Sequence, residues 1–272
     1  MLPKPLRTVF YWILRSGPLG RAFADLIAWG FFGYVKLFRI PPQKDVAGLT
    51  VISHKHKFIF FGIPKVASRS FYNLFVQEKK LEYGIEWHEK RDGFFDAVEN
   101  YPDYYKFSFV RNPWSRIVSC YNSKIADNII GKRARITSFY KQLKGGMKFD
   151  DFINWLGIDE GSDDVADRHW ISQHQFLCDH NGIMLCDFVG KYESLDEDWK
   201  VVCERIGIEC TPLAQKGYVS AEGKTRNPTD TKTEKTTVQK TNYKDFFTSE
   251  TREAVAKRYS KDIKLFGYRF DE

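Results

Sequence analysis

The clearest pattern along the chain lies in residues 58–75, where an apolar run changes its period halfway. Residues 58–63 are almost continuously apolar, which is typical of a strand buried on both faces. Pro64 has no N–H for a sheet ladder, so we expect the strand to end there. Beyond it, Phe71, Leu74 and Phe75 recur at i, i+3 and i+4, the apolar stripe of a helix. The pattern predicts a buried strand, a tight turn and a helix.

The residues between this strand and this helix predict a site for an anion. A helix that follows a tight turn directs free backbone N–H groups and the positive end of its dipole towards the turn. Lys65 adds a full charge, Ser68 and Ser70 add hydroxyl donors, and the guanidinium of Arg69 suits a bidentate contact with oxyanions. A solvated turn with incidental basic residues is the alternative. The expected site consists of Lys65, Val66, Ala67, Ser68, Arg69 and Ser70.

This turn is similar to a nucleotide-binding P-loop but departs from it. A Walker A motif counted from Gly62 needs glycine at 67, lysine at 68 and a hydroxyl residue at 69. The chain has Ala67, Ser68 and Arg69 there, so no hydroxyl stands where Mg²⁺ would be held. We therefore expect a phosphate cradle that works without a metal. The expected fold is α/β, a P-loop-like three-layer fold with a central, mainly parallel sheet flanked by helices.

A second strand-to-helix turn is predicted in residues 107–121. The strand should end at Arg111, Asn112 is a good N-cap, and Pro113 suits the first helical position because its missing N–H costs nothing there. Ser119 lies on the predicted helix one turn after Ser115. Two such turns in one parallel sheet would hold two phosphates of one nucleotide.

Composition limits the partners of the chain. With 272 residues, 43% of them hydrophobic, the chain is long enough for one sizeable core. The net charge of +7 and the pI of ≈ 9.0 favour anionic partners, such as nucleic acid, a nucleotide cofactor, an anionic glycan or a membrane surface. Five cysteines form no CxxC pair, so their spacing indicates neither a zinc site nor a disulfide framework. This cysteine usage favours a reducing compartment.

The two ends of the chain differ in kind from its middle. We expect an aromatic, basic and helical extension over residues 1–45, followed by one main domain over residues 46–272. The longest uncharged run near the N-terminus, residues 26–35, has ten residues, whereas a membrane span needs roughly 20. The extension is therefore expected either to pack on the domain as a helical hairpin or to lie on a membrane surface. Residues 224–244 contain seven Thr and five Lys and predict a surface loop, either a lid or a solvated linker.

The remaining segments show weaker patterns. Residues 81–101 have no clear period, and we expect their polar cluster around His88 to lie on a loop. Residues 168–175 mix polar and aromatic side chains and can form a capped surface helix. More regular elements are predicted as follows: helices over residues 149–156, from Asp196 to Gly207 and from Ser249 onward, and a third buried strand over residues 184–190.

Taken together, the motifs resemble those of a known family, the carbohydrate sulfotransferases that use 3′-phosphoadenosine-5′-phosphosulfate (PAPS). The resemblance covers roughly residues 58–268. Residues 64–70 resemble the family's 5′-phosphosulfate motif, and residues 110–116 with Ser119 resemble its 3′-phosphate motif. The branch with the chondroitin and HNK-1 sulfotransferases is indicated by three later segments: His169-Trp170 with Gln173, residues 187–195 and residues 259–268.

This resemblance implies transfer of a sulfuryl group from PAPS to a hydroxyl of a carbohydrate acceptor, with no metal. Lys65 would stabilise the oxygen that bridges sulfur and phosphorus, since such reactions need in-line positioning and preorganised cations. The implied cofactor-binding residues are those of the two turns: Lys65, Val66, Ala67, Ser68, Arg69 and Ser70 at the 5′-phosphosulfate, and Arg111 and Ser119 at the 3′-phosphate.

The acceptor hydroxyl also needs a base. His88 lies between the two phosphate motifs, where related sulfotransferases place a catalytic His or Glu. We therefore expect His88 to be the catalytic base, with Glu86, Glu89 and the more distant His169 as rivals.

Two other functions compete with this interpretation. A P-loop-type kinase of a nucleotide or small metabolite is the first, and the missing Walker residues argue against it. A basic nucleic-acid-binding protein is the second, but the resemblance predicts a glycan acceptor and no nucleic-acid partner.

Location is expected from two departures from the family. The animal members have an N-terminal membrane anchor and a close pair of cysteines after the His-Trp segment; here Cys178 matches one cysteine, and His180 stands near the place of the other. We therefore expect a cytoplasmic protein, with peripheral membrane contact through residues 1–40 as an option and the Golgi lumen as the alternative.

Overall fold

The computed structural model describes residues 44–90, 92–126, 139–213 and 242–271. The expected N-terminal extension lies outside the described residues except for its last two positions, and so does the basic loop at 224–244 except for its last three. Among the described residues, no helix is both long enough and apolar enough to cross a membrane.

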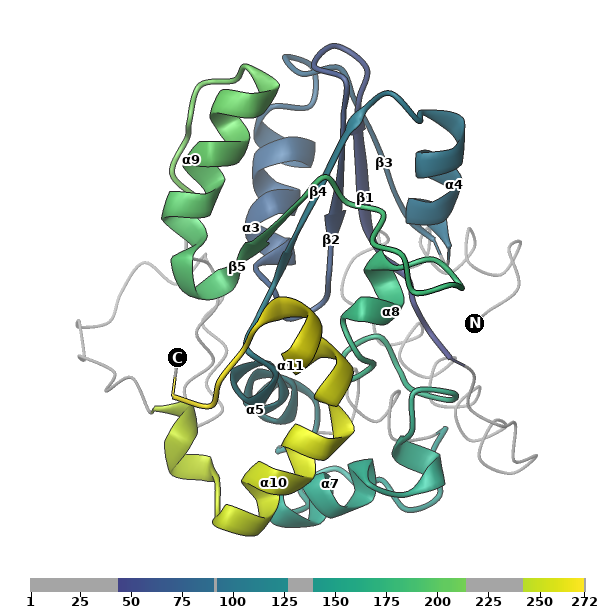
Figure 1. The fold of residues 1–272 in the computed structure, drawn as a ribbon, viewed down its shortest axis with the longest axis vertical. Helices are drawn as coiled ribbons and strands as arrows, with labels where there is room; N and C mark the ends of the chain where they lie inside the picture. Colours follow the sequence, from purple (N-terminus) through teal and green to yellow (C-terminus); the bar gives the residue numbers. More distant parts are fainter. Residues whose placement is uncertain (1–43, 91, 127–138, 214–241, 272) are drawn as a thin grey trace, which may run out of the picture.

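A five-stranded sheet forms the centre of the molecule, in the order β3-β1-β2-β4-β5 (Figure 1). Its strands are β1 (Gly48–Ser53), β2 (Phe58–Gly62), β3 (Ile85–Lys90), β4 (Tyr105–Val110) and β5 (Phe188–Lys191). β2, β4 and β5 run parallel, whereas β1 is antiparallel to both β2 and β3. The sheet is therefore mixed, and not mainly parallel as expected. A physical reason is that only residues 54–57 join β1 to β2, whereas parallel neighbours need a long crossover.

Helices cover both faces of the sheet. Alternate side chains of β2 point to opposite faces, so Phe60 packs on Phe71 of α3 (Ser68–Tyr72) at 4.4 Å while Phe61 packs on Phe94 of α4 (Gly93–Asn100) at 4.9 Å. α9 (Leu195–Ile206) joins the α3 face through Trp199, and α8 (His174–Leu177) joins the α4 face through Phe176. These aromatic contacts form the core of the α/β fold.

The other helices gather beyond the carboxyl ends of β2 and β4, at the bottom of Figure 1. They are α5 (Pro113–Lys124), α7 (Phe149–Leu156), α10 (Ser249–Arg258) and α11 (Ser260–Phe266). Short helical turns complete the described chain: the π-helix η1 (Asn73–Glu78), which continues α3, and the 3₁₀ turns η2 (Asp159–Gly161), η3 (Tyr192–Ser194) and η4 (Tyr243–Phe246). This arrangement puts a cap of helices over the edge of the sheet where both predicted turns open.

Several predicted elements are confirmed, and others are wrong. α7 has the predicted bounds, Asn112 caps α5 with Pro113 at its start, and Gly207 ends α9 with a φ of 66°. The polar cluster around His88 forms strand β3 rather than a loop, because it pairs along its whole length with β1. The predicted last helix is two helices that meet at Tyr259, and the third buried strand begins at Phe188 instead of residue 184.

Candidate functional site

The anion turn, residues 63–67, has an unusual backbone. It leaves β2 at Gly62 and enters α3 at Ser68, and two of its non-glycine residues, Lys65 (φ 72°) and Ala67 (φ 51°), adopt left-handed conformations. Such conformations each cost about 1–3 kcal/mol and cluster at ligand clamps and active sites. The N-cap residue Ala67 has no polar side chain, so no side chain caps the first amides of α3. The turn has the backbone form of an anion-binding concavity.

Lys65 is the central cation of this turn. Its Nζ donates to Ser123 Oγ of α5 at 2.7 Å. Burial, with smaller contributions from the neighbouring charges of Lys124, Arg111 and Arg69, lowers the pKa of Lys65 to about 8. Positive charge is therefore concentrated where the backbone N–H groups point, and a bound anion would offset the repulsion between these charges.

Arg111 links the second turn to the first. Its Nη1 donates to the backbone oxygen of Lys65 at 3.3 Å, its Nε donates to Ser115 Oγ at 2.9 Å, and its guanidinium lies 4.4 Å from the ring of Tyr192. Ser119 is half-buried one helical turn beyond Ser115. The structure therefore joins Arg111 to the anion turn and to Ser115 of α5, one helical turn before Ser119.

The rest of the predicted first turn lies at the start of α3. Ser68 is half-buried, Arg69 is exposed and Ser70 is buried. The N–H of Ser70 bonds to the oxygen of Ala67 at 2.8 Å, and Val66 is fully inside the core. Arg69 is thus available to a ligand, whereas Val66 anchors the turn.

Arg116 is buried and binds backbone oxygens, a role that its place in the sequence motif of residues 110–116 did not predict. Its side chain is only 2% exposed. Its Nε donates to Pro64 O at 3.2 Å, its Nη1 to Ile171 O at 2.7 Å and its Nη2 to Arg168 O at 3.3 Å. One buried guanidinium therefore ties residues 168–171 to the anion turn.

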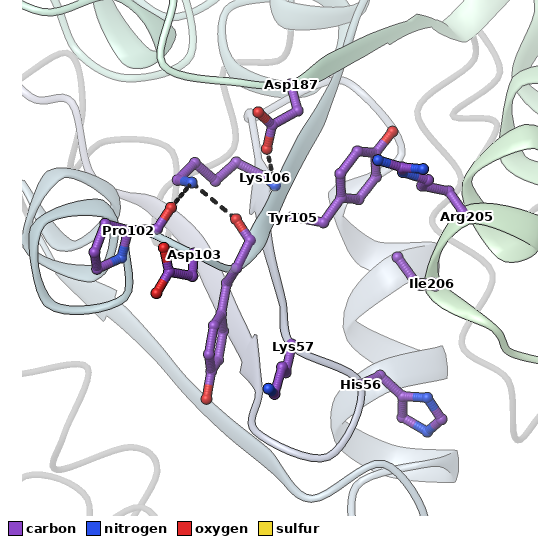
Figure 2. Close-up of a pocket in the computed structure, with 10 residues that line it drawn as sticks. His56, Lys57, Pro102, Asp103, Tyr105, Lys106, Asp187, Arg205 and Ile206 are labelled. Carbon is purple, nitrogen blue, oxygen red and sulfur yellow. Dashed lines mark hydrogen bonds between the residues drawn. The ribbon is translucent and has the colours of Figure 1, made fainter.

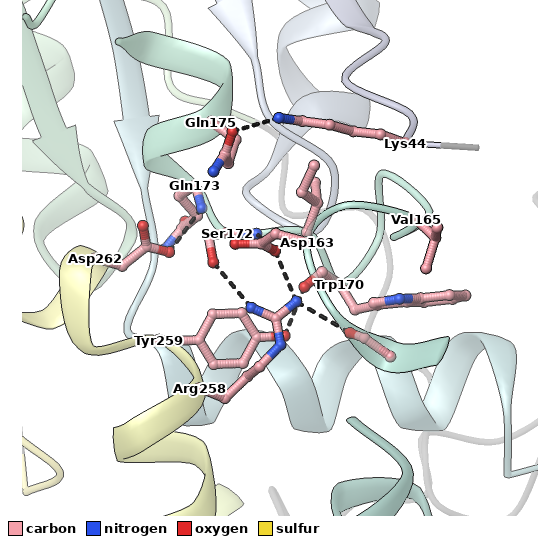
Figure 3. Close-up of polar contacts among 12 residues, drawn as sticks. Lys44, Asp163, Val165, Trp170, Ser172, Gln173, Gln175, Arg258, Tyr259 and Asp262 are labelled. Atoms are coloured by element: carbon pink, nitrogen blue, oxygen red, sulfur yellow. Dashed lines mark hydrogen bonds and ion pairs between the residues drawn. The ribbon is translucent and has the colours of Figure 1, made fainter. Parts of the chain in front are cut away.

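The segment after residue 171 is held by the C-terminal helices (Figure 3). Gln173 exchanges two hydrogen bonds with the backbone of Arg111, and its own N–H donates to the buried carboxylate of Asp262 at 2.6 Å. Arg258 of α10 bonds to Asp163 at 2.7 Å and to Ser172 Oγ at 3.3 Å. These contacts fix residues 163–173 beside the mouth of both turns.

A histidine–aspartate pair lies in this segment. Asp167 Oδ1 accepts hydrogen bonds from the backbone N of His169 at 2.9 Å and from its Nδ1 at 2.5 Å. Burial, with smaller contributions from Lys124 and Lys65, lowers the pKa of His169 to about 4 despite the opposing charge of Asp167. The mutual influence of these groups places His169 within electrostatic reach of Lys65.

His88 lies elsewhere. It pairs with Thr50, which pairs in turn with Phe61, so its side chain is on the face covered by α4 and not on that of α3. Its Nε2 lies 3.2 Å from Gly93 O. Of its two rivals, Glu86 approaches His54 at 3.5 Å, and Glu89 approaches Arg168 at 3.6 Å. Glu89 is thus linked through Arg168 to the segment that carries His169, and the role of His88 stays a prediction.

Sequence reasoning missed three side chains near Lys65. Ser123 and Lys124 lie at the end of α5, and Ser123 follows Ser115 and Ser119 at spacings of four, so an inspection of that helix face finds it. Asp167 has no comparable signal, because its role depends on the local turn that brings it back to His169.

A separate cavity of about 600 Å³ lies at the other end of the parallel strands (Figure 2). Residues just before or at the start of β2 and β4 line it, among them Lys57, Tyr105 and Lys106. It belongs to the amino ends of these strands and is therefore distinct from the anion turn. Within the described residues, no group of three or more His, Cys, Asp or Glu side chains is placed to hold a metal ion.

Comparisons with known proteins agree with the chemistry of the two turns. A family model described as "Sulfotransferase family" matches residues 49–269. Carbohydrate sulfotransferase 10 of Xenopus laevis is 26% identical over 270 residues, which cover 84% of this chain and 69% of that protein. Carbohydrate sulfotransferase 11 of Mus musculus is 30% identical over 183 residues, 61% of this chain and 47% of that protein. No solved structure matches the chain.

The comparisons also correct one expectation. The chain spans from about half to about two thirds of the length of these relatives. The carbohydrate sulfotransferases among them are enzymes of the Golgi lumen, so the expected cytoplasmic location is wrong. The inference failed because it relied on unpaired cysteines and on a missing anchor, neither of which reports directly on the compartment.

Proposed function

Since the chain belongs to the sulfotransferase family, we propose that it transfers a sulfuryl group from PAPS to a hydroxyl group of a carbohydrate. The observation that carries the proposal is the meeting of two strand-to-helix turns at Lys65, where Arg111 bonds to the lysine's own backbone oxygen. The carbohydrate class of the acceptor is supported by the names of the relatives, all of them carbohydrate sulfotransferases.

The residues of the first turn are proposed to hold the 5′-phosphosulfate of PAPS. The left-handed backbone at Lys65 and Ala67 and the uncapped start of α3 fit a tetrahedral anion. Lys65 faces the bridging oxygen in this proposal. The other ligands in this turn are Val66, Ala67, Ser68, Arg69 and Ser70.

The second turn is proposed to hold the 3′-phosphate. Arg111 precedes α5 and bonds to Ser115, one helical turn before Ser119, and the ring of Tyr192 packs against the guanidinium of Arg111. When PAPS is bound, it supplies the activated sulfuryl group. The residues of the chain supply position and positive charge, which is how enzymes lower barriers in reactions where negative charge shifts to a leaving group.

Three finer assignments extend this proposal. The domain spans residues 46–272 after a separate extension, its sheet is a P-loop-like variant, and no metal takes part. Contact of residues 1–40 with a membrane surface is a further hypothesis for which a vesicle-binding comparison of the full chain and a chain from residue 41 is the test. His88 as the base stays a prediction, and its position on the α4 face does not favour it.

A kinase is not favoured, and one experiment separates the two enzymes. The chain is incubated with ³⁵S-labelled PAPS and a panel of glycans that carry free hydroxyls, and separately with labelled ATP, Mg²⁺ and nucleosides. We expect label on a glycan in the first incubation, unchanged by EDTA, and none in the second. Phosphoryl transfer that requires Mg²⁺ would contradict the proposal.

A further inference from the structure

We propose that His169 accepts the proton of the acceptor hydroxyl and that Asp167 sets the tautomer in which it can do so. This inference rests on the proposed function, since it names a catalytic residue for that reaction. Three observations carry it: the hydrogen bonds of the pair, the position of the pair, and the charges around it.

The hydrogen bonds define which nitrogen is free to accept a proton. An ionised carboxylate only accepts hydrogen bonds, so the contact between Asp167 Oδ1 and His169 Nδ1 puts the imidazole hydrogen on Nδ1. Although burial opposes it, the neighbouring His169 lowers the pKa of Asp167 and keeps that carboxyl ionised. Nε2 is therefore the atom with a lone pair, as it is in histidines that act as general bases.

The position of the pair follows from Arg116. This guanidinium bonds to Pro64 O in the anion turn and to the oxygens of Arg168 and Ile171, one residue before and two residues after His169. The backbone on both sides of His169 is thus held beside the turn that carries Lys65. The side chain of His169 is 17% exposed, so it is largely shielded from bulk water.

The charges around His169 make its pKa depend on whether the sulfuryl donor, PAPS, is bound. Asp167 favours the protonated ring, whereas burial, Lys124 of α5 and Lys65 of the anion turn oppose it, and together they hold the pKa near 4. A ligand that brings the 5′-phosphosulfate to Lys65 offsets the opposition from that lysine. Binding of the donor therefore raises the basicity of His169 at the moment when a base is needed.

The proton balance of the step is as follows. The acceptor oxygen forms a bond to sulfur while the bond between sulfur and the bridging oxygen breaks. The electron pair of the broken bond stays on the 5′-phosphate oxygen, which faces Lys65, and the hydroxyl proton passes to Nε2 of His169. The imidazolium then releases the proton to water once the products have left.

The main alternative is a histidine that only stabilises the loop, and two rival bases exist in His88 and Glu89. A structural role explains the bonds to Asp167 but predicts no response of the ring to the cofactor. His88 lies on the α4 face of the sheet with its Nε2 3.2 Å from Gly93 O, and Glu89 is half-exposed in an ion pair with Arg168. The experiment therefore needs a readout on the imidazole itself as well as on turnover.

The first test is an NMR titration of the histidine Cε1–H signals of the wild-type chain, with the His169 signal identified by its loss in His169→Gln. Without ligand, we expect the signal to stay in the neutral form down to about pH 5, as a pKa near 4 requires. Saturating adenosine 3′,5′-bisphosphate should move the midpoint upward. A midpoint that does not move, or that moves down, would overturn the proposal without requiring any variant to be active.

The second test compares turnover with binding. His169→Gln should lower kcat by ~10²–10⁴-fold, the usual contribution of a general base, and leave bisphosphate affinity within a few-fold. Asp167→Asn should lower kcat in the same direction, because an amide does not select the same tautomer. His54→Ala, a histidine that contacts Tyr104 and Glu86, is the matched control with unchanged turnover.

The outcomes distinguish a wrong assignment of the base from a failure of the proposed function. If His88→Ala or Glu89→Gln is inactive while His169→Gln retains turnover, the base is misassigned and the sulfotransferase survives. If wild-type protein transfers no label from ³⁵S-labelled PAPS to any glycan, the proposed function itself fails. Circular dichroism of each variant identifies any loss of activity that comes from unfolding.

Discussion

The two ends of the parallel strands are both basic, yet only one of them has the features of an active site. At the amino ends, Lys57, Lys106 and Arg205 line the cavity of about 600 Å³ (Figure 2). Lys106 donates there to the backbone oxygens of Pro102 and Tyr104, and Asp187 accepts from its N–H. These bonds indicate that Lys106 stabilises the loop that precedes β4.

At the carboxyl ends, the positive charges are arranged differently. Burial lowers the pKa of Lys65 from 10.5 to about 8, and the turn around it carries two left-handed residues. Such a turn costs free energy in the absence of a ligand. The comparison teaches that a hollow lined with cations is weaker evidence for a binding site than a small, strained turn in which a cation loses its water.

The strongest way to break this comparison is to remove one lysine from each end. Lys65→Ala should lower kcat by ~10²–10³-fold, the loss typical for a single donor to developing negative charge. Lys57→Ala, at the mouth of the amino-end cavity, should leave kcat unchanged. Steady-state sulfuryl transfer measures both, and equal effects of the two substitutions would show that the anion turn has no special role.

A smaller effect is expected at Arg111, with Arg205 as a control that also lies near an aromatic ring. Arg111→Ala should weaken binding of adenosine 3′,5′-bisphosphate by ~10–150-fold, because a charge-assisted hydrogen bond contributes about 1.5–3 kcal/mol. Binding of adenosine 5′-phosphate should change much less. Arg205→Ala, whose guanidinium lies 5.5 Å from the ring of Tyr105 at the other end, should alter neither. Calorimetry measures all four affinities, and a matched loss for both nucleotides would remove the 3′-phosphate from Arg111.

The smallest effect concerns the proton that Lys65 takes up when an anion binds, which tests whether this lysine has lost its water in the free protein. Lys65 has a pKa of about 8 without ligand, and a bound anion raises it, so the protein should take up a fraction of a proton when the bisphosphate binds near pH 8.5. Calorimetry in two buffers with different enthalpies of ionisation measures this uptake. Lys65→Arg should bind without it, since arginine keeps its proton. Equal uptake by the two proteins would assign the proton to another group.

The two turns could be predicted from the sequence alone because their signals are local. The change of period after Pro64 and the Asn112-Pro113 cap lie within a few residues of what they define. The edge of the sheet was missed because strand β3 shows no alternation that separates it from a loop, and its pairing with β1 spans more than thirty residues of chain. Such pairing is a property of the whole fold and not of a short segment.

The candidate base illustrates the same limit. His88 was favoured because it stands between the two motifs along the chain; pairing with Thr50 puts it on the α4 face, and its role stays a prediction. His169 comes near Lys65 through contacts of Arg116 with residues about 50 positions away. No local sequence pattern predicts a contact between residues so far apart in the chain.

The bonds from the C-terminal residues to the start of α5 also determine when the site can form during synthesis. Asn112 Nδ2 donates to Arg269 O, Trp114 Nε1 donates to Arg252 O, and Asp262 holds Gln173 against Arg111. These partners are separated by 89 to 157 positions, and contacts between distant parts of a chain form slowly. Domains fold as units while the ribosome adds residues from the N-terminus onward. A nascent chain that has not yet released residues 252–269 therefore lacks the bonds that hold Asn112, Trp114 and Gln173 in place.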